Sequence, residues 1–181
     1  MGKQGAINSS SLKTGPEYRN GNGFARDPRP EELEAMMDAA LHFCTLRANK
    51  PVGEVIRRIR RSDLWANSTL RYALAKEIRK VLLSDPEVRD VYLMGSVIED
   101  QARLSSDIDL ILHVHDEKEK YETWLLLIDK GLTERFRKRF GLHKDFTSLI
   151  DYHVVNDEDV SCKNGYGSLI TSIHTNLTRL S

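Results

Sequence analysis

The stretch LMGSVIEDQARLSSDIDLIL, residues 93–112, decides the fold because it contains the end of one strand and most of another. Residues 88–94 and 108–114 are rich in the aliphatic, β-branched and aromatic side chains that strands prefer. Since side chains alternate along a strand, Asp107 and Asp109 share one face of the second strand with Ile111, and the other face carries Ile108, Leu110, Leu112 and Val114. The stretch therefore predicts two strands, the second beginning with paired carboxylates.

A third strand is predicted over residues 149–155, where Asp151 and His153 share a face. Between the second and third strands lies a helical stretch, about residues 117–140, which we expect to be interrupted near Gly131. If the two strands lie near each other, three carboxylates converge on one open face of the sheet. His153 fits either a residue that orients substrate or a partly exposed residue of the sheet.

The chain before residue 88 predicts helices. Apolar residues between Leu33 and Cys44 recur at helical spacing, and they form one stripe of a helix that ends near Asn49. A shorter helix follows Pro51. A third helix is expected to begin after Asn67-Ser68, since both residues are good caps, and to end before Pro86.

The order of elements predicts an α+β fold, in which a small mixed β-sheet is backed by helices and preceded by a helical extension. Residues 1–27 are rich in Gly, Ser and Asn, which predicts a flexible tail. Residues 28–181 then form a single domain. Its parts are the helical extension, the core and a C-terminal segment that could add a short helix and an edge strand; they span residues 28–86, 87–155 and 156–181.

Composition excludes several classes of protein. The 181 residues include 27 basic and 27 acidic ones, so the formal net charge is zero, which argues against sequence-blind binding of nucleic acid. There is no apolar stretch of 18 residues and no apolar signal segment at the N-terminus, so we expect no membrane association. The only cysteines, Cys44 and Cys162, fit a reduced, cytoplasmic protein without a zinc site.

Three convergent carboxylates need a counter-ion. Two unit charges about 4 Å apart repel by roughly 4 kcal/mol at an effective dielectric constant near 20. Oxygen ligands from Asp107, Asp109 and Asp151 favour a hard divalent ion, Mg²⁺ above all and Mn²⁺ as a substitute. Gly95 lets the backbone approach a phosphate closely, and a helical turn beginning at Ser96 would point its positive end and a hydroxyl at that phosphate. This combination fits metal-assisted phosphoryl or nucleotidyl transfer.

These residues carry a resemblance to a known family. Gly-Ser, ten intervening residues, Asp-x-Asp on a strand and a later strand with one Asp resemble the polymerase β-like nucleotidyltransferase superfamily, in particular its minimal members. The resemblance implies that Asp107 and Asp109 bind two Mg²⁺ ions, and that Asp151 binds one of them and helps to activate the attacking hydroxyl. It also implies that Gly95 and Ser96 hold the nucleoside triphosphate, such as ATP, and we add Ser106 to the nucleotide-binding residues.

The implied reaction moves a nucleoside monophosphate from an NTP to a hydroxyl group and releases pyrophosphate. Little chain remains for a large acceptor-binding domain, which favours a protein or small-molecule acceptor, or a site completed by a second subunit, as in a homo-oligomer, or by a partner protein. Small members of the family include antitoxins that adenylylate partner toxins and enzymes that modify antibiotics, so the resemblance supports both kinds of acceptor.

Two alternatives come from other features. Small members often follow Gly-Ser with Arg and a further Gly, whereas this chain has Val97-Ile98-Glu99-Asp100, and the acidic pair favours a catalytically silent member that binds a nucleotide or a partner. The basic runs in residues 57–61 and 135–139 suggest an RNA-interacting module, but they also fit solvated helix faces. They would form one nucleic-acid surface only if the fold placed them on the same side.

Overall fold

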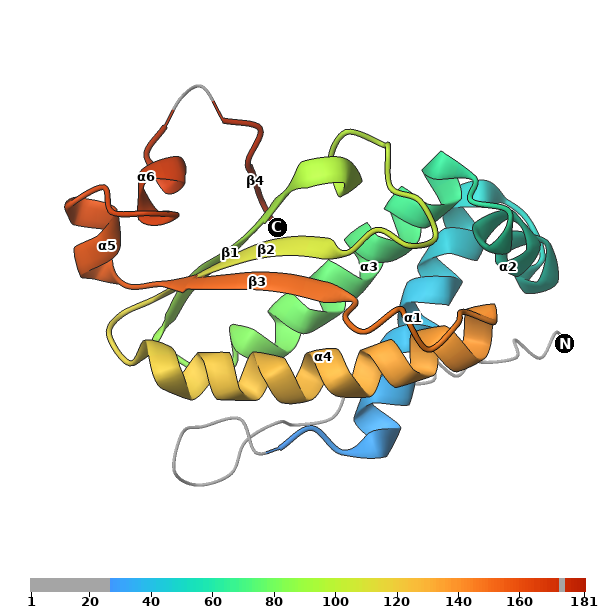
Figure 1. Ribbon diagram of the computed structural model, residues 1–181, viewed down its shortest axis with the longest axis horizontal. Helices are drawn as coiled ribbons and strands as arrows, with labels where there is room; N and C mark the ends of the chain where they lie inside the picture. Colours follow the sequence, from blue (N-terminus) through green and yellow to red (C-terminus); the bar gives the residue numbers. More distant parts are fainter. Residues whose placement is uncertain (1–26, 173–174) are drawn as a thin grey trace, which may run out of the picture.

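The computed structural model describes residues 27–172 and 175–181 (Figure 1). The predicted flexible tail lies outside the described residues except for its last residue, Asp27. The sheet has four strands in the order β3-β2-β1-β4, with β1 antiparallel to both β2 and β4, and β2 parallel to β3. The strands span Val88–Met94, Ile108–Val114, Ile150–Val155 and Thr178–Arg179, in chain order. The predicted mixed sheet and α+β class are confirmed.

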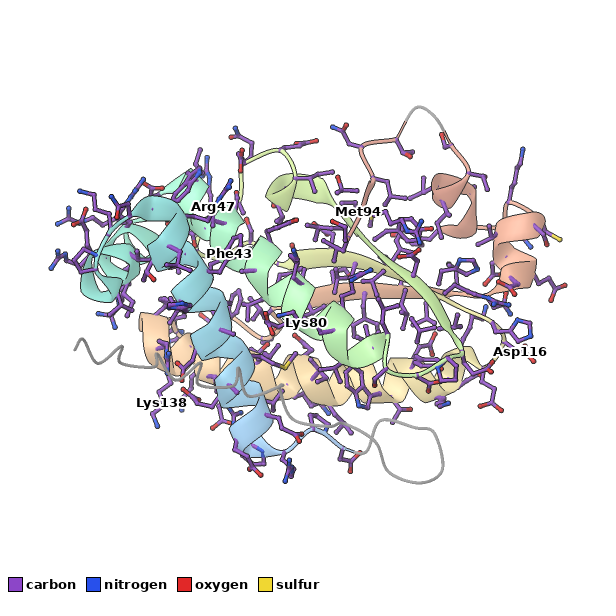
Figure 2. The ribbon with its side chains drawn as sticks, turned by 180° about the vertical axis from the view of Figure 1, so that it is seen from behind. Phe43, Arg47, Lys80, Met94, Asp116 and Lys138 are labelled. Carbon is purple, nitrogen blue, oxygen red and sulfur yellow. The ribbon has the colours of Figure 1, made fainter. Side chains whose placement is uncertain are left out.

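Helices pack on the sheet and on one another. Helices α3 and α4 contact the strands, and α1 packs against both of these helices (Figure 1). Asp116, just before α4, and Lys138, near the end of α4, lie at opposite ends of the molecule, so α4 runs the length of the sheet (Figure 2). The α-helices span Pro30–Ala48, Val52–Arg60, Leu64–Leu82, Lys118–Phe140, Asp157–Ser161 and Gly167–Ile170, and a single 3₁₀ turn, η1, spans Gly95–Val97.

Helix α3 begins earlier than the sequence pattern indicated. Asp63 is its N-cap, because its side chain accepts a hydrogen bond from the N–H of Ala66 at 2.9 Å. Asn67 and Ser68 lie buried within the helix instead of capping it. The Asn67 side chain donates to the carbonyl of Ile59, and the Ser68 hydroxyl accepts from the N–H of Ala102. Their polar groups therefore join the helix to other segments.

Helix α4 is continuous, so the expected interruption near Gly131 was wrong. A Cβ atom at Gly131 would lie 2.3 Å from Cδ1 of Leu33 in α1. The glycine leaves room for the end of the Leu33 side chain where α1 and α4 approach each other, and the helix continues through it.

Among the described residues, none of the helices combines the length and apolar character that a membrane span requires. Both cysteines are free, with Cys44 buried between helices and Cys162 exposed.

Candidate active site

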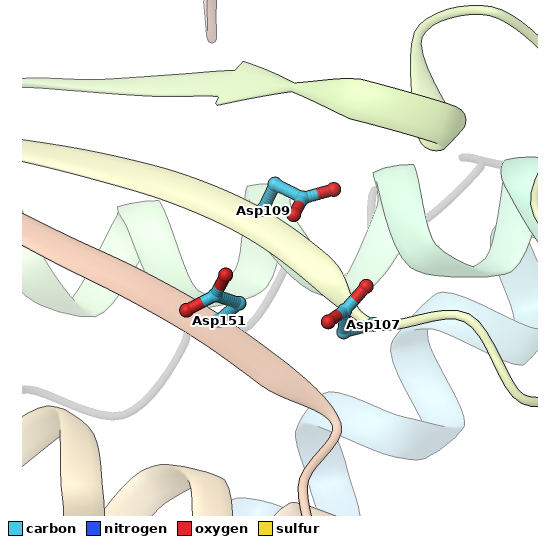
Figure 3. A group of neighbouring side chains, drawn as sticks. All are labelled: Asp107, Asp109 and Asp151. Atoms are coloured by element: carbon cyan, nitrogen blue, oxygen red, sulfur yellow. The ribbon is translucent and has the colours of Figure 1, made fainter. Parts of the chain in front are cut away.

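The three predicted carboxylates lie together at the end of the sheet where β2 and β3 begin (Figure 3). Asp109 and Asp151 are partners in the parallel register of β2 and β3, and Asp107 directly precedes β2. One carboxylate oxygen from each of the three lies within 4.8 Å of the others. Asp107 and Asp151 are exposed and Asp109 is half-buried, so the cluster is open on one side. The predicted convergence on one face is therefore present in the structure.

This cluster has little positive charge beside it: the buried Arg71 guanidinium attracts Asp107 but forms no ion pair with it. Burial, and then the charges of Asp107 and Asp151, raise the pKa of Asp109 to about 6. Among residues 27–172 and 175–181, no basic side chain forms an ion pair with Asp107 or Asp109, and only His153 approaches Asp151, at 3.8 Å. A set of oxygen ligands with excess negative charge suits a hard divalent cation, and the three residues thus fit Mg²⁺ or Mn²⁺.

Gly95 brings the backbone against this cluster. Its φ of +69° lies in the left-handed region, and a Cβ atom there would sit 2.2 Å from Oδ2 of Asp109. Only glycine satisfies both constraints. Ser96 follows in η1, and its hydroxyl bonds to no other residue that the structure describes. Because η1 is one short turn, its dipole is weak, and the close backbone approach is the stronger feature.

Ser106 has a role within its own loop. Its hydroxyl accepts a hydrogen bond from the N–H of Arg103 at 2.9 Å. The predicted nucleotide contact of Ser106 stays a prediction, and its visible contacts fix the loop that leads into Asp107.

A buried arginine also holds in place the loop that leads into Asp107. Arg71 in α3 is fully buried, and its guanidinium donates to the carbonyl oxygens of Leu104 and Ser106 at 2.8 and 2.6 Å. It also donates to Oδ1 of Asn67 and lies over the ring of Phe136. Burial lowers the pKa of Arg71 to about 10, which still leaves it charged at neutral pH. This cation therefore holds the backbone immediately before Asp107.

A buried aspartate does the same for β3. Asp129 in α4 is 6% exposed, and its Oδ1 accepts from the N–H groups of Leu149 and Ile150 at 2.8 and 2.9 Å. Its Oδ2 accepts from the hydroxyl of Ser148. These bonds fix the start of β3 one residue before Asp151. Two charged residues from two helices thus position the two strands that carry the carboxylates.

The sequence prediction missed both of these residues, although a signal was present. Asp129 lies four residues after Leu125 and three before Leu132, so it falls on the apolar stripe of its helix. Arg71 lies three residues before Leu74, which places it on the buried face of α3. A charged residue on an apolar stripe must be paired or solvated by other polar groups, so its position predicts a buried network.

The acidic pair after η1 points to other parts of the molecule. Oε1 of Glu99 accepts a hydrogen bond from the Asn176 side chain at 3.3 Å. Asp100 lines a pocket of about 420 Å³ that also includes Arg47 and Lys76. The hydrogen bond ties Glu99 to the C-terminal segment, and Asp100 faces this pocket instead of the carboxylate cluster.

The two basic runs meet at one end of the molecule, where the Arg60 side chain donates to the carbonyl of Arg139. Ion pairs neutralise part of this charge, since Arg58 pairs with Asp63 and Arg139 pairs with Glu34 and Asp38. Binding of RNA to these helices stays a prediction.

One family model matches the chain. Residues 76–163 match the family described as Polymerase beta, Nucleotidyltransferase, and the matched range includes all three clustered aspartates and the Gly-Ser turn. No curated protein and no solved structure matches the chain.

Proposed function

We propose that this chain, whose residues 76–163 match the nucleotidyltransferase family model, transfers a nucleoside monophosphate from an NTP, such as ATP, to a hydroxyl group. The observation that carries the proposal is the cluster of Asp107, Asp109 and Asp151, whose ligand oxygens lie within 4.8 Å of one another beside Gly95. We also propose a cytoplasmic location, because the two cysteines of the sequence show no spacing typical of a disulfide scaffold.

The triphosphate would lie against the Gly95-Ser96 turn. The missing Cβ atom leaves the backbone free to approach phosphate oxygens, and the Ser96 hydroxyl can donate to one of them. Asp107 and Asp109 would hold two Mg²⁺ ions, one of them shared with Asp151, and Mn²⁺ could replace them. Bound there, these ions would polarise the phosphoryl oxygens and neutralise the developing charge.

The proposed reaction is a displacement at the α-phosphorus. The acceptor oxygen forms a bond to the α-phosphorus, the bond to the oxygen that bridges to the β-phosphate breaks, and pyrophosphate leaves. Asp151 accepts the hydrogen bond of the attacking hydroxyl and receives its proton, because of the three carboxylates it is the exposed one that lies on an edge strand. Arg71 and Asp129 keep the carboxylates in place and are positioning residues.

A label-transfer experiment tests this function. The chain is incubated with Mg²⁺ and each of four α-³²P-labelled NTPs, with a protein extract or a small-metabolite extract as the source of acceptors. We expect transfer of the α-label, none from γ-labelled ATP, and loss of transfer in Asp109→Ala. Transfer of the γ-label would identify a kinase and contradict the proposal.

The same experiment separates the catalytically silent alternative. Binding of NTP by the chain, with no transfer to either extract, would support a nucleotide- or partner-binding protein. The positions of Glu99 and Asp100 favour a catalytically active protein, because among the described residues neither side chain contacts the carboxylate cluster. Label on protein bands would identify a protein acceptor, and label on small metabolites would identify the other class.

A further inference from the structure

Strand β3 forms one edge of the sheet, and its outer side carries free peptide groups. The N–H of Ile108 donates to the carbonyl of Leu149, so alternate residues of β3 from Leu149 direct their N–H and C=O groups at β2. Ile150, Tyr152 and Val154 therefore direct theirs outward. The outward groups of Ile150 are used, since its N–H donates to Asp129 and its carbonyl accepts from Ser148.

The next two outward residues have no such partners. No described residue bonds to the N–H or the carbonyl of Tyr152 or Val154. A free row of strand donors and acceptors is a template for pairing with another extended chain. Bulges, prolines and lysines, which protect many edge strands, are absent from Ile150–Val155. The open edge of β3 is therefore able to accept a strand.

A groove of about 250 Å³ follows this edge. Its floor is the β3 segment 152–155, one wall is α4 with Glu122, and the other wall comes from residues 164–166 of the C-terminal segment. The ring of Tyr166 stacks on that of His153 with centroids 3.5 Å apart, which holds this second wall on the open face of the sheet. The groove thus lies along the open edge of β3, between α4 and the C-terminal segment.

The groove leads to the carboxylate cluster, because Asp151 directly precedes Tyr152 on the same strand. Paired strands lie about 4.8 Å apart, and side chains of opposite residues on one face have Cβ atoms about 5 Å apart. A chain paired along β3 would place one of its side chains beside Asp151, on the face that carries Asp109.

We propose that the acceptor is an extended, hydroxyl-bearing peptide segment of a protein, which adds as a strand to the open edge of β3 and presents its hydroxyl to Asp151. The inference rests on the proposed function and specifies its acceptor. Free backbone groups select an extended polypeptide over a small molecule, since pairing with Tyr152 and Val154 needs alternating donors and acceptors. Of the acidic residues that line the groove, Asp159 pairs with Lys118, whereas Glu122 carries no ion pair with Lys or Arg among the described residues, which favours a basic residue in the bound peptide.

The binding test uses synthetic peptides and needs no nucleotide. A library of seven-residue peptides alternates valine with serine, threonine, tyrosine or lysine, and binding to the ¹⁵N-labelled full chain is followed by NMR and by amide hydrogen exchange. We expect shifts and slower exchange at Tyr152 and Val154. For the best peptide, N-methylation along one edge should abolish binding and N-methylation along the other should not.

Two substitutions in the protein sharpen the test. Val154→Pro removes one outward donor and leaves the bonds to β2, so affinity should fall about fivefold, the value of one hydrogen bond. Glu122→Lys should lower affinity for lysine-containing peptides about twofold to fivefold. Glu134→Lys, three turns further along α4 and outside the groove, is the matched control and should change nothing.

Three results would overturn the docking proposal: no binding by any library member, equal binding of both N-methylated forms, or a dimer of the chain that protects the β3 edge. The proposed function fails separately. Peptide binding at the edge without label transfer would contradict the transferase activity alone. Label transfer to small metabolites, with no peptide bound, would contradict the docking alone.

Discussion

Carboxylates lie near both ends of β2, in opposite electrostatic surroundings. At its start, Asp109 faces two other carboxylates, and its pKa is raised to about 6. Near its other end, Asp157 of α5 accepts from Arg89 at 2.9 Å and lies 2.7 and 2.8 Å from ring nitrogens of His115 and His113. Arg89, then His115 and His113, hold the pKa of Asp157 well below its usual range.

This difference separates a site that binds from a contact that holds the fold together. A carboxylate whose partners are all supplied by the protein joins α5 to the sheet and has no capacity left for a ligand. The cluster at Asp109 retains unmet negative charge, which costs stability and which a bound cation would offset. Unmet charge in a strongly positioned cluster is therefore the better indicator of function.

The largest expected effect is on activity. Asp109→Asn should lower label transfer at least about 1,000-fold, which corresponds to about 4 kcal/mol, because the cluster loses a charged ligand. Asp157→Asn should leave the rate within about threefold, since Asp157 contacts the opposite end of β2. Initial rates of α-label transfer measure both. Equal losses in the two variants would remove the distinction between the two ends.

The next effect concerns the backbone beside Asp109. Gly95→Ala forces an L side chain into φ +69° and a Cβ atom into contact with the Asp109 carboxylate. We expect destabilisation of about 2 kcal/mol or more and a roughly 100-fold loss of transfer, because small displacements of catalytic groups are costly. Thermal unfolding and transfer rates measure these changes.

Gly53→Ala is the matched control, since a Cβ atom there meets nothing within 4 Å and the residue lies in helix α2. It should stabilise the chain by about 0.5–1 kcal/mol and leave transfer unchanged. If Gly95→Ala behaved like Gly53→Ala, the close approach to Asp109 would have no functional weight.

Much of the site could be predicted because its signals are local. Alternation along residues 107–114 fixed the face of Asp107 and Asp109, and the apolar strand around Asp151 distinguished it from neighbouring aspartates. The pairing of β2 with β3 was an expectation, since register depends on contacts distant in sequence. The bonds of Arg71 with Ser106 join residues 35 positions apart, and spacing within one element cannot specify such partners.

The errors in the helices have similar causes. Asn67 and Ser68 favour caps by intrinsic preference, but Asp63 lies one turn earlier and takes that role, so Asn67 bonds to α2 and Ser68 to the loop at Ala102. Gly131 weakens an isolated helix, yet here it permits the approach of Leu33, and tertiary packing offsets the intrinsic cost.

A third prediction compares stability at the two ends in metal-free buffer at pH 7.5. Asp109→Asn should stabilise the chain by about 1–2 kcal/mol, because it removes repulsion within the cluster. Asp157→Asn should destabilise it by about 0.5–1 kcal/mol, a small value since the side chain of Asp157 is 40% exposed. Urea unfolding gives both signs. Adding 10 mM MgCl₂ should stabilise the wild type and have little effect on Asp109→Asn.

The smallest expected effect is the pH dependence at Asp157. A carboxyl group whose pKa is lower in the folded chain than in the unfolded chain stabilises the fold above its unfolded pKa, about 3.9. That contribution is lost as the pH falls toward the depressed pKa. The stability difference between wild type and Asp157→Asn should therefore shrink as the pH falls below about 4. Unfolding in urea at successive pH values measures it. A difference that grew below pH 4 would show that the contacts of Asp157 with Arg89 and the two histidines favour its protonated form, and would reverse the contrast between the two ends of β2.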